Sequence, residues 1–233
     1  MRTTLVTGAA GAFGNVLVKA LASRGDRVVA VVRPGGKVEG IAAEPNVTRK
    51  AIDLVSRDSW KQALEELAED GLVPDGAVLS AGNWMGGEPL HSSSDDRIWR
   101  AMIENNLETA HCALASLLPG MVQRRRGSVV LVGSRAAERP WESAGASAYA
   151  AAKAAVVALA QVTAQEVLAE GVRVNVVLPS IIDTPPNRAA MPKADFARWV
   201  APEALVEAIE FLLSDSARDV SGSVLPVYGR VGV

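Results

Sequence analysis

Seven short runs of apolar, mostly β-branched residues recur along the chain, and longer helical patterns separate them. This alternation is typical of right-handed βαβ units that build a parallel sheet. Several runs are almost unbroken, as expected for strands that helices cover on both faces. We therefore predict a doubly wound α/β fold. The expected strands are Thr3–Thr7, Arg27–Val32, Val47–Asp53, Gly76–Ser80, Ser128–Gly133, Val172–Leu178 and Ser223–Val227.

Helix signals lie between these strands. Phe13, Leu17 and Leu21 recur every four residues, which indicates one apolar helix face. A second helix is expected over Tyr149–Ala169. The proline-rich segment Pro179–Pro192 interrupts the alternation and is expected to form a loop over the carboxyl edge of the sheet. No repeat or low-complexity linker is visible, so residues 1–233 are expected to form one domain.

Composition excludes several classes of protein. Apolar residues make up 49% of the chain, the net charge is −2 and the pI is about 5.8, so nothing favours nucleic acid as a partner. Cys112 is the only cysteine, which rules out an intrachain disulfide, and His91 and His111 are too isolated to predict a metal site. We expect no signal peptide, no membrane span and a cytoplasmic location.

A glycine-rich turn, Thr7–Gly14, follows the first expected strand and opens the first expected helix. Gly8, Gly11 and Gly14 would let backbone amides approach a pyrophosphate at the positive end of that helix. The position between a strand and an amphipathic helix favours dinucleotide binding and a Rossmann-type sheet. The alternative is a tight turn whose glycines serve packing alone.

The end of the second strand should decide which nicotinamide cofactor binds. An acidic residue there would hold the ribose 2′-hydroxyl of NAD, whereas an arginine accommodates the 2′-phosphate of NADP. The chain offers Arg33 and no nearby carboxylate, so NADP(H) is favoured over NAD(H). The alternative is a solvated arginine at a strand end.

Tyr149 and Lys153 lie four residues apart in an alanine-rich helical pattern. This spacing places the phenol and the ammonium on one helix face. A tyrosine with a pKa of about 10 needs a nearby cation to act as an acid–base group at neutral pH. Lys153 is the expected cation.

Together with the glycine turn, this pair resembles the short-chain dehydrogenase/reductases along nearly the whole chain. The resemblance implies that Ser134 orients the substrate oxygen, that Asn106 supports a water in a proton relay, and that Asp53 contacts the adenine. It also implies that Ile182 and Thr184, in Pro179–Thr184, face the nicotinamide. The implied cofactor contacts are Gly8, Gly11, Phe13, Gly14, Arg33, Asp53, Leu54, Ala81, Gly82, Lys153, Pro179, Ile182 and Thr184.

The chain departs from the usual family pattern in three places. Ala12 stands where the commonest branch has its second glycine, and Ser80 replaces an asparagine that braces the sheet. Ser134 lies 15 residues before Tyr149, so the intervening loop is longer than usual. None of these changes removes a chemical group from the expected site.

Two segments are similar to quinonoid dihydropteridine reductases, namely Gly82–Gly87 and Asp183–Trp199. Trp84 would then stack on a flat heteroaromatic substrate, with Asn187 and Trp199 as further substrate contacts within a loop over residues 180–200. The alternative for Trp84 is a hydrophobic plug beneath a loop. Ser134 and Arg33 argue against a simple transfer, because those reductases typically lack the serine and carry an acidic residue at the arginine's position.

We therefore expect an enzyme that transfers hydride from NAD(P)H to a carbonyl or quinonoid C=N substrate, with Tyr149 as general acid. The alternative within enzymes is a reductase of 3-oxoacyl thioesters or ketones. The alternative outside enzymes is a catalytically inactive NADP-binding sensor or scaffold. The expected partners are a small-molecule substrate and further copies of the chain, as a homodimer or homotetramer that pairs around Asp95–Leu118 and Tyr149–Ala169.

Overall fold

The computed structural model describes residues 1–36, 41 and 44–231. Its centre is a seven-stranded parallel sheet in the order β3-β2-β1-β4-β5-β6-β7. This arrangement confirms the predicted fold class. The strands are β1 Thr3–Thr7, β2 Arg27–Val32, β3 Val47–Ala51, β4 Gly76–Leu79, β5 Gly127–Val132, β6 Val172–Pro179 and β7 Val224–Val227.

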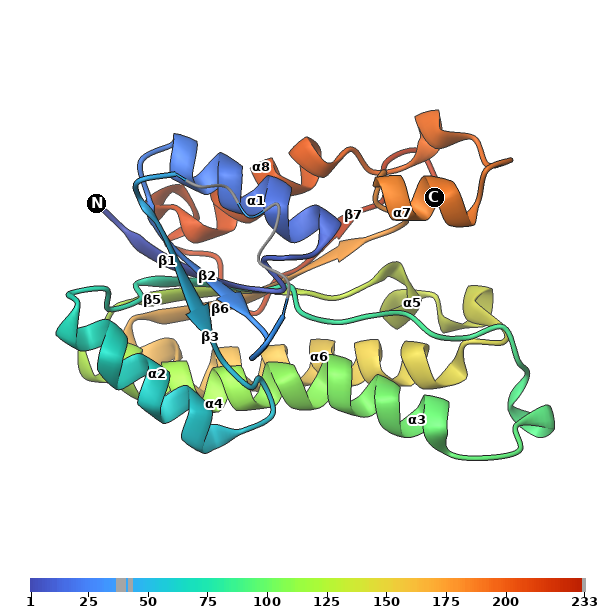
Figure 1. Cartoon of the computed structure of the whole chain (residues 1–233), viewed down its shortest axis with the longest axis horizontal. Coiled ribbons are helices and arrows are strands. Elements are labelled where there is room, and N and C mark those ends of the chain that lie inside the picture. Colours follow the sequence, from blue (N-terminus) through green and yellow to red (C-terminus); the bar gives the residue numbers. More distant parts are fainter. Residues whose placement is uncertain (37–40, 42–43, 232–233) are drawn as a thin grey trace.

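Helices cover both faces of the sheet (Figure 1). Helices α1 (Ala12–Ser23) and α8 (Pro202–Leu213) lie on one face, and α2 (Arg57–Glu69), α4 (Thr109–Gln123) and α6 (Ser147–Glu166) lie on the other. Shorter helices, α3 (Arg97–Met102), α5 (Arg135–Glu138) and α7 (Pro185–Ala190), belong to the carboxyl side of the sheet.

Alternation along each strand supplies two hydrophobic cores. In β5, Val129 and Leu131 join the core beneath α2, α4 and α6, whereas Val130 joins the core beneath α1 and α8. Successive side chains of a strand point to opposite faces, so both faces need an apolar cover. The apolar strand runs of the sequence are explained by these two cores.

Helices α3 and α4 are joined by a π-helical turn over Ile103–Glu108. The sequence predicted one helix around Asp95–Leu118, and the structure instead continues to Gln123 through Pro119. Proline lacks the N–H that would bond the carbonyl four residues earlier. The Arg57 guanidinium donates to that carbonyl, on Ala115, at 2.9 Å and so satisfies it.

Several predicted boundaries were wrong by one or two residues. Strand β3 ends at Ala51 rather than Asp53, because the Asp53 carboxylate accepts a bond from the Val55 amide at 3.2 Å and forms a turn. The segment Pro179–Pro192 is not wholly a loop, since Pro185 opens α7. Gly25 and Gly71 follow the ends of α1 and α2 with positive φ.

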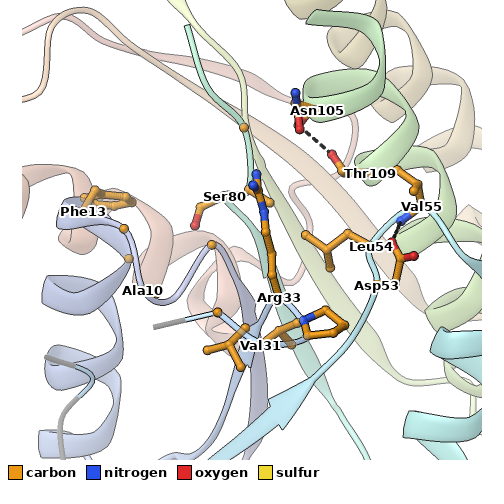
Figure 2. A pocket seen from close by; sticks show the side chains of 18 of the residues that line it. Ala10, Phe13, Val31, Arg33, Asp53, Leu54, Val55, Ser80, Asn105 and Thr109 are labelled. Atoms are coloured by element: carbon orange, nitrogen blue, oxygen red, sulfur yellow. Dashed lines mark hydrogen bonds between the residues drawn. The ribbon is translucent and has the colours of Figure 1, made fainter. Parts of the chain in front are cut away.

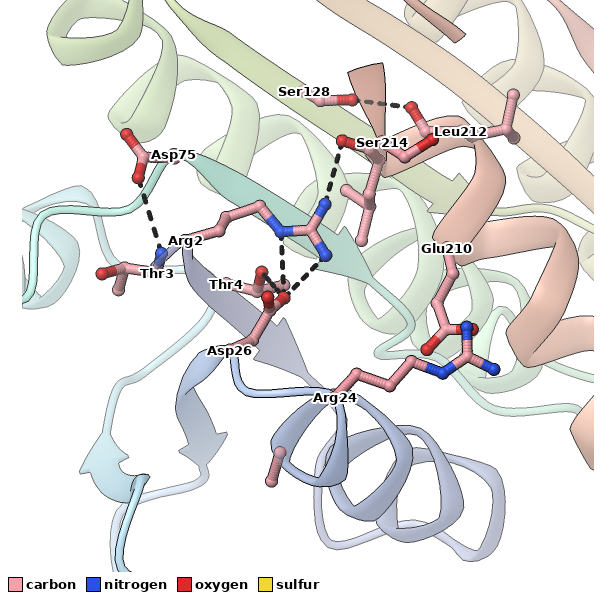
Figure 3. A network of polar contacts seen from close by, with 12 residues as sticks. Arg2, Thr3, Thr4, Arg24, Asp26, Asp75, Ser128, Glu210, Leu212 and Ser214 are labelled. Carbon is pink, nitrogen blue, oxygen red and sulfur yellow. Dashed lines mark hydrogen bonds and ion pairs between the residues drawn. The ribbon is translucent and has the colours of Figure 1, made fainter. Parts of the chain in front are cut away.

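A polar network fastens the amino edge of the sheet (Figure 3). Arg2 donates to the Asp26 carboxylate at 2.7 Å and to the Leu213 carbonyl at 3.0 Å, at the end of α8. Thr4 donates to the same carboxylate at 2.7 Å, and Arg24 forms an ion pair with Glu210. These contacts join β1, α1 and α8, so this edge is a structural clamp.

By length and composition alone, α6 could cross a membrane, although the sequence predicted no span. One side of the helix packs against β6 and the π turn, and its buried residues include Lys153 and Val156. The core helix of a folded domain passes the same test of length and composition, so we assign α6 to the core.

Candidate active site

A cavity of about 950 Å³ opens at the carboxyl edge, where the strand order reverses between β1 and β4 (Figure 2). Ligands of open α/β sheets bind at such a reversal. The structure brings together there the predicted contacts from four segments of the chain. The predicted residues that line it are Gly8, Gly11, Phe13, Gly14, Arg33, Asp53, Leu54, Ala81 and Gly82.

Two glycines of the turn, Gly8 and Gly14, have no room for a side chain. Gly8 has a φ of 70°, and a Cβ on Gly14 would lie 2.1 Å from the Gly8 carbonyl oxygen. Gly11 caps α1 without a side-chain hydrogen bond, so amides of the first turn remain available to a ligand. A dinucleotide therefore fits this cavity by its size and by the bare helix end it offers to a pyrophosphate.

Arg33 follows β2, is exposed, and extends its side chain into the cavity (Figure 2). Among the residues that the structure describes, no carboxylate pairs with its guanidinium. Asp53 lies across the cavity beside Leu54. The arginine therefore adds positive charge at the end of the cavity next to β2.

Ser80 replaces the family's bracing asparagine and still links two strands. Its hydroxyl donates to the Thr7 carbonyl at 2.6 Å, and the Ala81 amide donates to the Thr7 hydroxyl at 3.1 Å. Ser80 also lines the cavity. The brace between β1 and β4 is thus made by a shorter side chain.

Tyr149, Ser134 and Lys153 lie together beyond Gly82. Ser134 caps α5 by accepting from the Ala136 amide at 3.2 Å, and it shares a side-chain hydrogen bond with Tyr149. The Lys153 Nζ lies 5.9 Å from the centroid of the Tyr149 ring and donates to the Val132 carbonyl at 2.9 Å. The phenol and the ammonium are therefore neighbours on α6, as their spacing predicted.

The electrostatics of this group differ from the sequence expectation. Burial raises the pKa of Tyr149, and the bond to Ser134 opposes that rise. Burial also lowers the pKa of Lys153 to about 8. Ser134, rather than Lys153, is the group that lowers the phenol's pKa here, so acidification of Tyr149 by Lys153 stays a prediction.

Asn106 lies in the π turn and is only 1% exposed. Its Nδ2 donates to the carbonyls of Asn83 and Met102, both at 3.1 Å, and its Oδ1 has no partner among the described residues. A cavity of about 10 Å³ adjoins it and is also lined by Lys153. That is about the volume that one water molecule requires.

The π turn supplies cavity residues that sequence reasoning missed. Glu104 and Asn105 of the turn, and Thr109 at the start of α4, line the large cavity although only Asn106 was predicted. A π turn brings side chains of adjacent residues to positions that a 3.6-residue period does not indicate. No signal in the sequence marked this turn, so the neighbours of Asn106 were not found.

The predicted nicotinamide contacts lie at the end of β6. Pro179 is its last residue, Thr184 caps α7 and is buried, and Ile182 pairs with Val200 in a parallel bridge. Asn187 donates to the Ile182 carbonyl at 2.8 Å. None of these lines the large cavity, so their contact with a cofactor stays a prediction.

Two tryptophans predicted to touch substrate have different surroundings. Trp199 is 7% exposed, and its ring lies 4.8 Å from that of Phe196, so its position favours packing within the loop. Trp84 is 60% exposed beside Gly86. Of the two, only Trp84 presents an open ring.

Side chains within the loop over residues 180–200 bind one another. Arg188 donates to the Asp183 carboxylate at 2.5 and 2.7 Å, and its guanidinium lies 4.8 Å above the Phe196 ring. The bond from Arg188 lowers the pKa of Asp183. These contacts give the loop a defined form in the free protein.

The described part of the chain holds no group of three potential metal ligands. Cys112 is buried, and its thiol pKa is raised by burial. A second cavity, of about 620 Å³, lies at the amino edge and is lined by Arg2 and Arg173. Arg173 donates to the carbonyls of Leu212 and Ser214, at 2.7 and 3.1 Å, so it closes the end of α8.

Comparison with known proteins agrees with this geometry. The family model described as short chain dehydrogenase matches residues 2–195. The chain is 29% identical over 239 residues to the 3-oxoacyl-[acyl-carrier-protein] reductase of Escherichia coli (strain K12), which covers 98% of this chain and 96% of the relative. It is 31% identical over 241 residues to the L-xylulose reductase of Bos taurus, with coverages of 98% and 95%.

Solved structures give the same picture. An oxidoreductase of the short chain dehydrogenase/reductase family from Burkholderia thailandensis superposes with a TM-score of 0.84 at 32% identity, covering 98% of this chain and 91% of the other. A 3-oxoacyl-[acyl-carrier protein] reductase with bound NAD from Brucella melitensis superposes with a TM-score of 0.83 at 26% identity, with coverages of 98% and 90%.

Proposed function

Because the chain belongs to the short-chain dehydrogenase/reductase family of NAD(P)-dependent oxidoreductases, we propose that it reduces a carbonyl group of a small molecule with NADPH. The observation that carries this proposal is the hydrogen-bonded pair of Ser134 and Tyr149, with Lys153 beside it, next to the glycine-lined cavity. This combination supplies a proton donor and an oxygen-binding hydroxyl at one place.

In the proposed reaction each group has a separate task. Bound nicotinamide supplies a hydride to the electrophilic carbon. Ser134 donates a hydrogen bond to the carbonyl oxygen and stabilises the charge that develops there. Tyr149 gives its proton to the same oxygen. The bond between the two hydroxyls in the free protein supports this division, because it holds the two groups next to each other.

Lys153 and Asn106 would return the proton. The Lys153 ammonium lies between the phenol and the small cavity beside Asn106, and we propose that it also holds the nicotinamide ribose. A water that donates to the unpartnered Asn106 Oδ1 fits that cavity. Proton transfer from this water through Lys153 would restore Tyr149 after each turnover.

NADPH is the cofactor that Arg33 favours. Its guanidinium lies in the cavity without a carboxylate partner among the described residues, as the 2′-phosphate of NADP requires. The ribose hydroxyl of NAD would instead need an acidic residue at the end of β2. The first substrate class to test is a 3-oxoacyl thioester, because several curated relatives carry that name.

A quinonoid dihydropterin is the second candidate, favoured by one specific observation. The Trp84 ring is 60% exposed on a loop that meets Gly145, just before α6. An open indole at that position suits a flat heteroaromatic substrate. The likeness to quinonoid dihydropteridine reductases therefore stays a prediction for the substrate alone.

The test is a substrate panel with NADPH absorbance as the readout. Tyr149→Phe should lower kcat by at least about 100-fold, the smallest effect usual for a positioned acid, while NADPH affinity stays within about twofold. Undiminished turnover would refute the role of the phenol. Binding of NADPH without its oxidation by any carbonyl or quinonoid compound would instead support the inactive sensor. A cytoplasmic location and a homo-oligomeric state complete the proposal.

A further inference from the structure

The segment between Ser134 and Tyr149 links the end of β5 to α6. It folds as the one-turn helix α5 followed by a 3-10 turn over Pro140–Ser143. Its charged side chains pair with one another, since Arg135 contacts Glu142 at 2.7 Å and Arg139 contacts the same carboxylate at 3.6 Å. These ion pairs thus cross-link residues 135–143, called the α5 segment below.

Tyr228, which follows β7, binds the α5 segment. Its hydroxyl donates to the Glu138 carboxylate at the end of α5, and the Arg135 guanidinium lies 5.5 Å above its ring. Burial, together with the bond to Glu138, raises the pKa of Tyr228 to about 12. The phenol therefore stays a hydrogen-bond donor at every pH at which an enzyme of this kind works.

The backbone of Tyr228 makes a second connection. Its carbonyl accepts from the Ser180 hydroxyl at 2.8 Å, and the Ser180 amide donates to the neighbouring Val227 carbonyl at 3.3 Å. Ser180 opens the segment expected to face the nicotinamide. The segment after Ser134 and the end of β6 are therefore both bonded to Tyr228.

The position of Ser134 depends on helix α5. Helix α5 contains only four residues. A single helical turn is not stable by itself, because the entropy lost in ordering its backbone exceeds the gain from its one or two hydrogen bonds. Ser134 is its N-cap and must also bond Tyr149. Helix α5 also packs against α6 and β6, and the bond from Tyr228 to Glu138 fixes its far end.

We propose that Tyr228 is a positioning residue that holds Ser134 in hydrogen-bond contact with Tyr149, through Glu138 and helix α5. This inference rests on the proposed carbonyl reduction, in which Ser134 binds the substrate oxygen. Tyr228 itself touches neither the substrate nor the cofactor in this assignment. Its loss should act only by way of Ser134.

A double-mutant cycle tests the proposal. Ser134→Ala alone should lower kcat by at least about 100-fold, the effect of losing one oxyanion donor. Tyr228→Phe alone should lower kcat by at least about tenfold and leave the KM for NADPH within about twofold. In Tyr228→Phe protein, the added Ser134→Ala should cost at least about tenfold less than it costs in the unchanged protein. Additive losses would overturn the proposal.

A second readout does not need activity, so it separates this proposal from the proposed function. The chain has two tyrosines, and carbon-13-labelled tyrosine gives one NMR signal for each. Ser134→Ala should shift the Tyr149 signal in otherwise unchanged protein and leave it unmoved in Tyr228→Phe protein. A shift in both backgrounds would mean that Ser134 keeps its place without Tyr228, which contradicts the proposal whether or not any substrate is turned over.

Variants of Glu138 supply the conservative comparison. Glu138→Gln keeps an oxygen that can accept from the phenol and should retain most of the turnover that Glu138→Ala loses. Equal losses in the two variants would contradict the role of this hydrogen bond. Glu170→Ala is the matched control, because Glu170 pairs with Arg125 at the amino edge, and its loss should change neither kcat nor the Tyr149 signal.

Discussion

At the scale of single residues, Lys153 shows what burial does to a charge. Its ammonium is surrounded by protein and donates to one backbone carbonyl, and burial lowers its pKa from 10.5 to about 8. Between these values the unfolded chain binds a proton that the folded chain has lost. Stability must therefore rise with pH across this interval.

Comparison with Lys153→Met isolates this effect. The stability of the unchanged protein relative to the variant should rise by up to about 3 kcal/mol between about pH 8 and pH 10.5, since the pKa is lowered from 10.5 to about 8. Denaturant unfolding of both proteins across the accessible part of this range measures it. A constant difference in stability would show that the ammonium is not buried as described.

Arg33 carries the prediction on cofactor choice. Arg33→Ala should lower kcat/KM for NADPH by about 10- to 100-fold, the worth of a charge-assisted bond, and change the value for NADH by less than about threefold. Steady-state rates with each cofactor give the ratio. Lys61→Ala removes an exposed cation on α2 and should leave both values unchanged. Comparable use of NADH and NADPH by the unchanged protein would remove this assignment.

At the scale of elements, two glycines differ in how much space surrounds the position of a Cβ. Gly14 lies at the β1–α1 junction, where a Cβ would overlap the Gly8 carbonyl oxygen at 2.1 Å. Gly120 lies within α4, where a Cβ would meet only the flexible end of Arg124, at 3.1 Å. The first position has no space for a methyl group, whereas at the second the Arg124 side chain must shift slightly to admit one.

Alanine substitutions should therefore have opposite effects. Gly14→Ala should lower the melting temperature by several degrees and weaken NADPH binding at least about tenfold, because the turn must open to admit the methyl group. Gly120→Ala should stabilise the protein by about 0.5–1 kcal/mol through helix propensity. Thermal unfolding and cofactor titration measure both. Equal effects of the two substitutions on stability would contradict the tight packing of Gly14 against Gly8.

At the scale of the whole molecule, α6 leaves one face uncovered. Ala151, Ala154, Ala158 and Val162 are exposed on it, with Val162 at 59%. Small side chains at helical spacing allow close approach of another helix. We propose that copies of the chain pair through this face and α4, and that residues 1–233 make one domain around the sheet.

Val162→Glu should shift the protein toward smaller species, because a carboxylate in an apolar helix contact has no partner. Sedimentation velocity reads the change, and Ala68→Glu on the exposed side of α2 is the matched control. If the two variants sediment alike, the α6 face is not the interface.

The sequence by itself determined the fold class and part of the cavity lining. Strand and helix periods, the spacing of Gly8, Gly11 and Gly14, and the four-residue step from Tyr149 to Lys153 are local properties. Local geometry places such residues on one turn or one helix face whatever the rest of the chain does. That is why the glycine turn lies at the cavity and the phenol lies beside the ammonium.

Only the tertiary structure decided the rest. The π turn that orients Asn106, the burial that lowers the pKa of Lys153, and the contact of Tyr228 with Glu138 all join segments that are distant in sequence or depend on packing. The sequence predicted the same role for Trp84 and Trp199, yet the Trp84 ring is exposed and the Trp199 ring is buried. Exposure and electrostatics depend on every neighbour in space, and a periodic pattern records only neighbours along the chain.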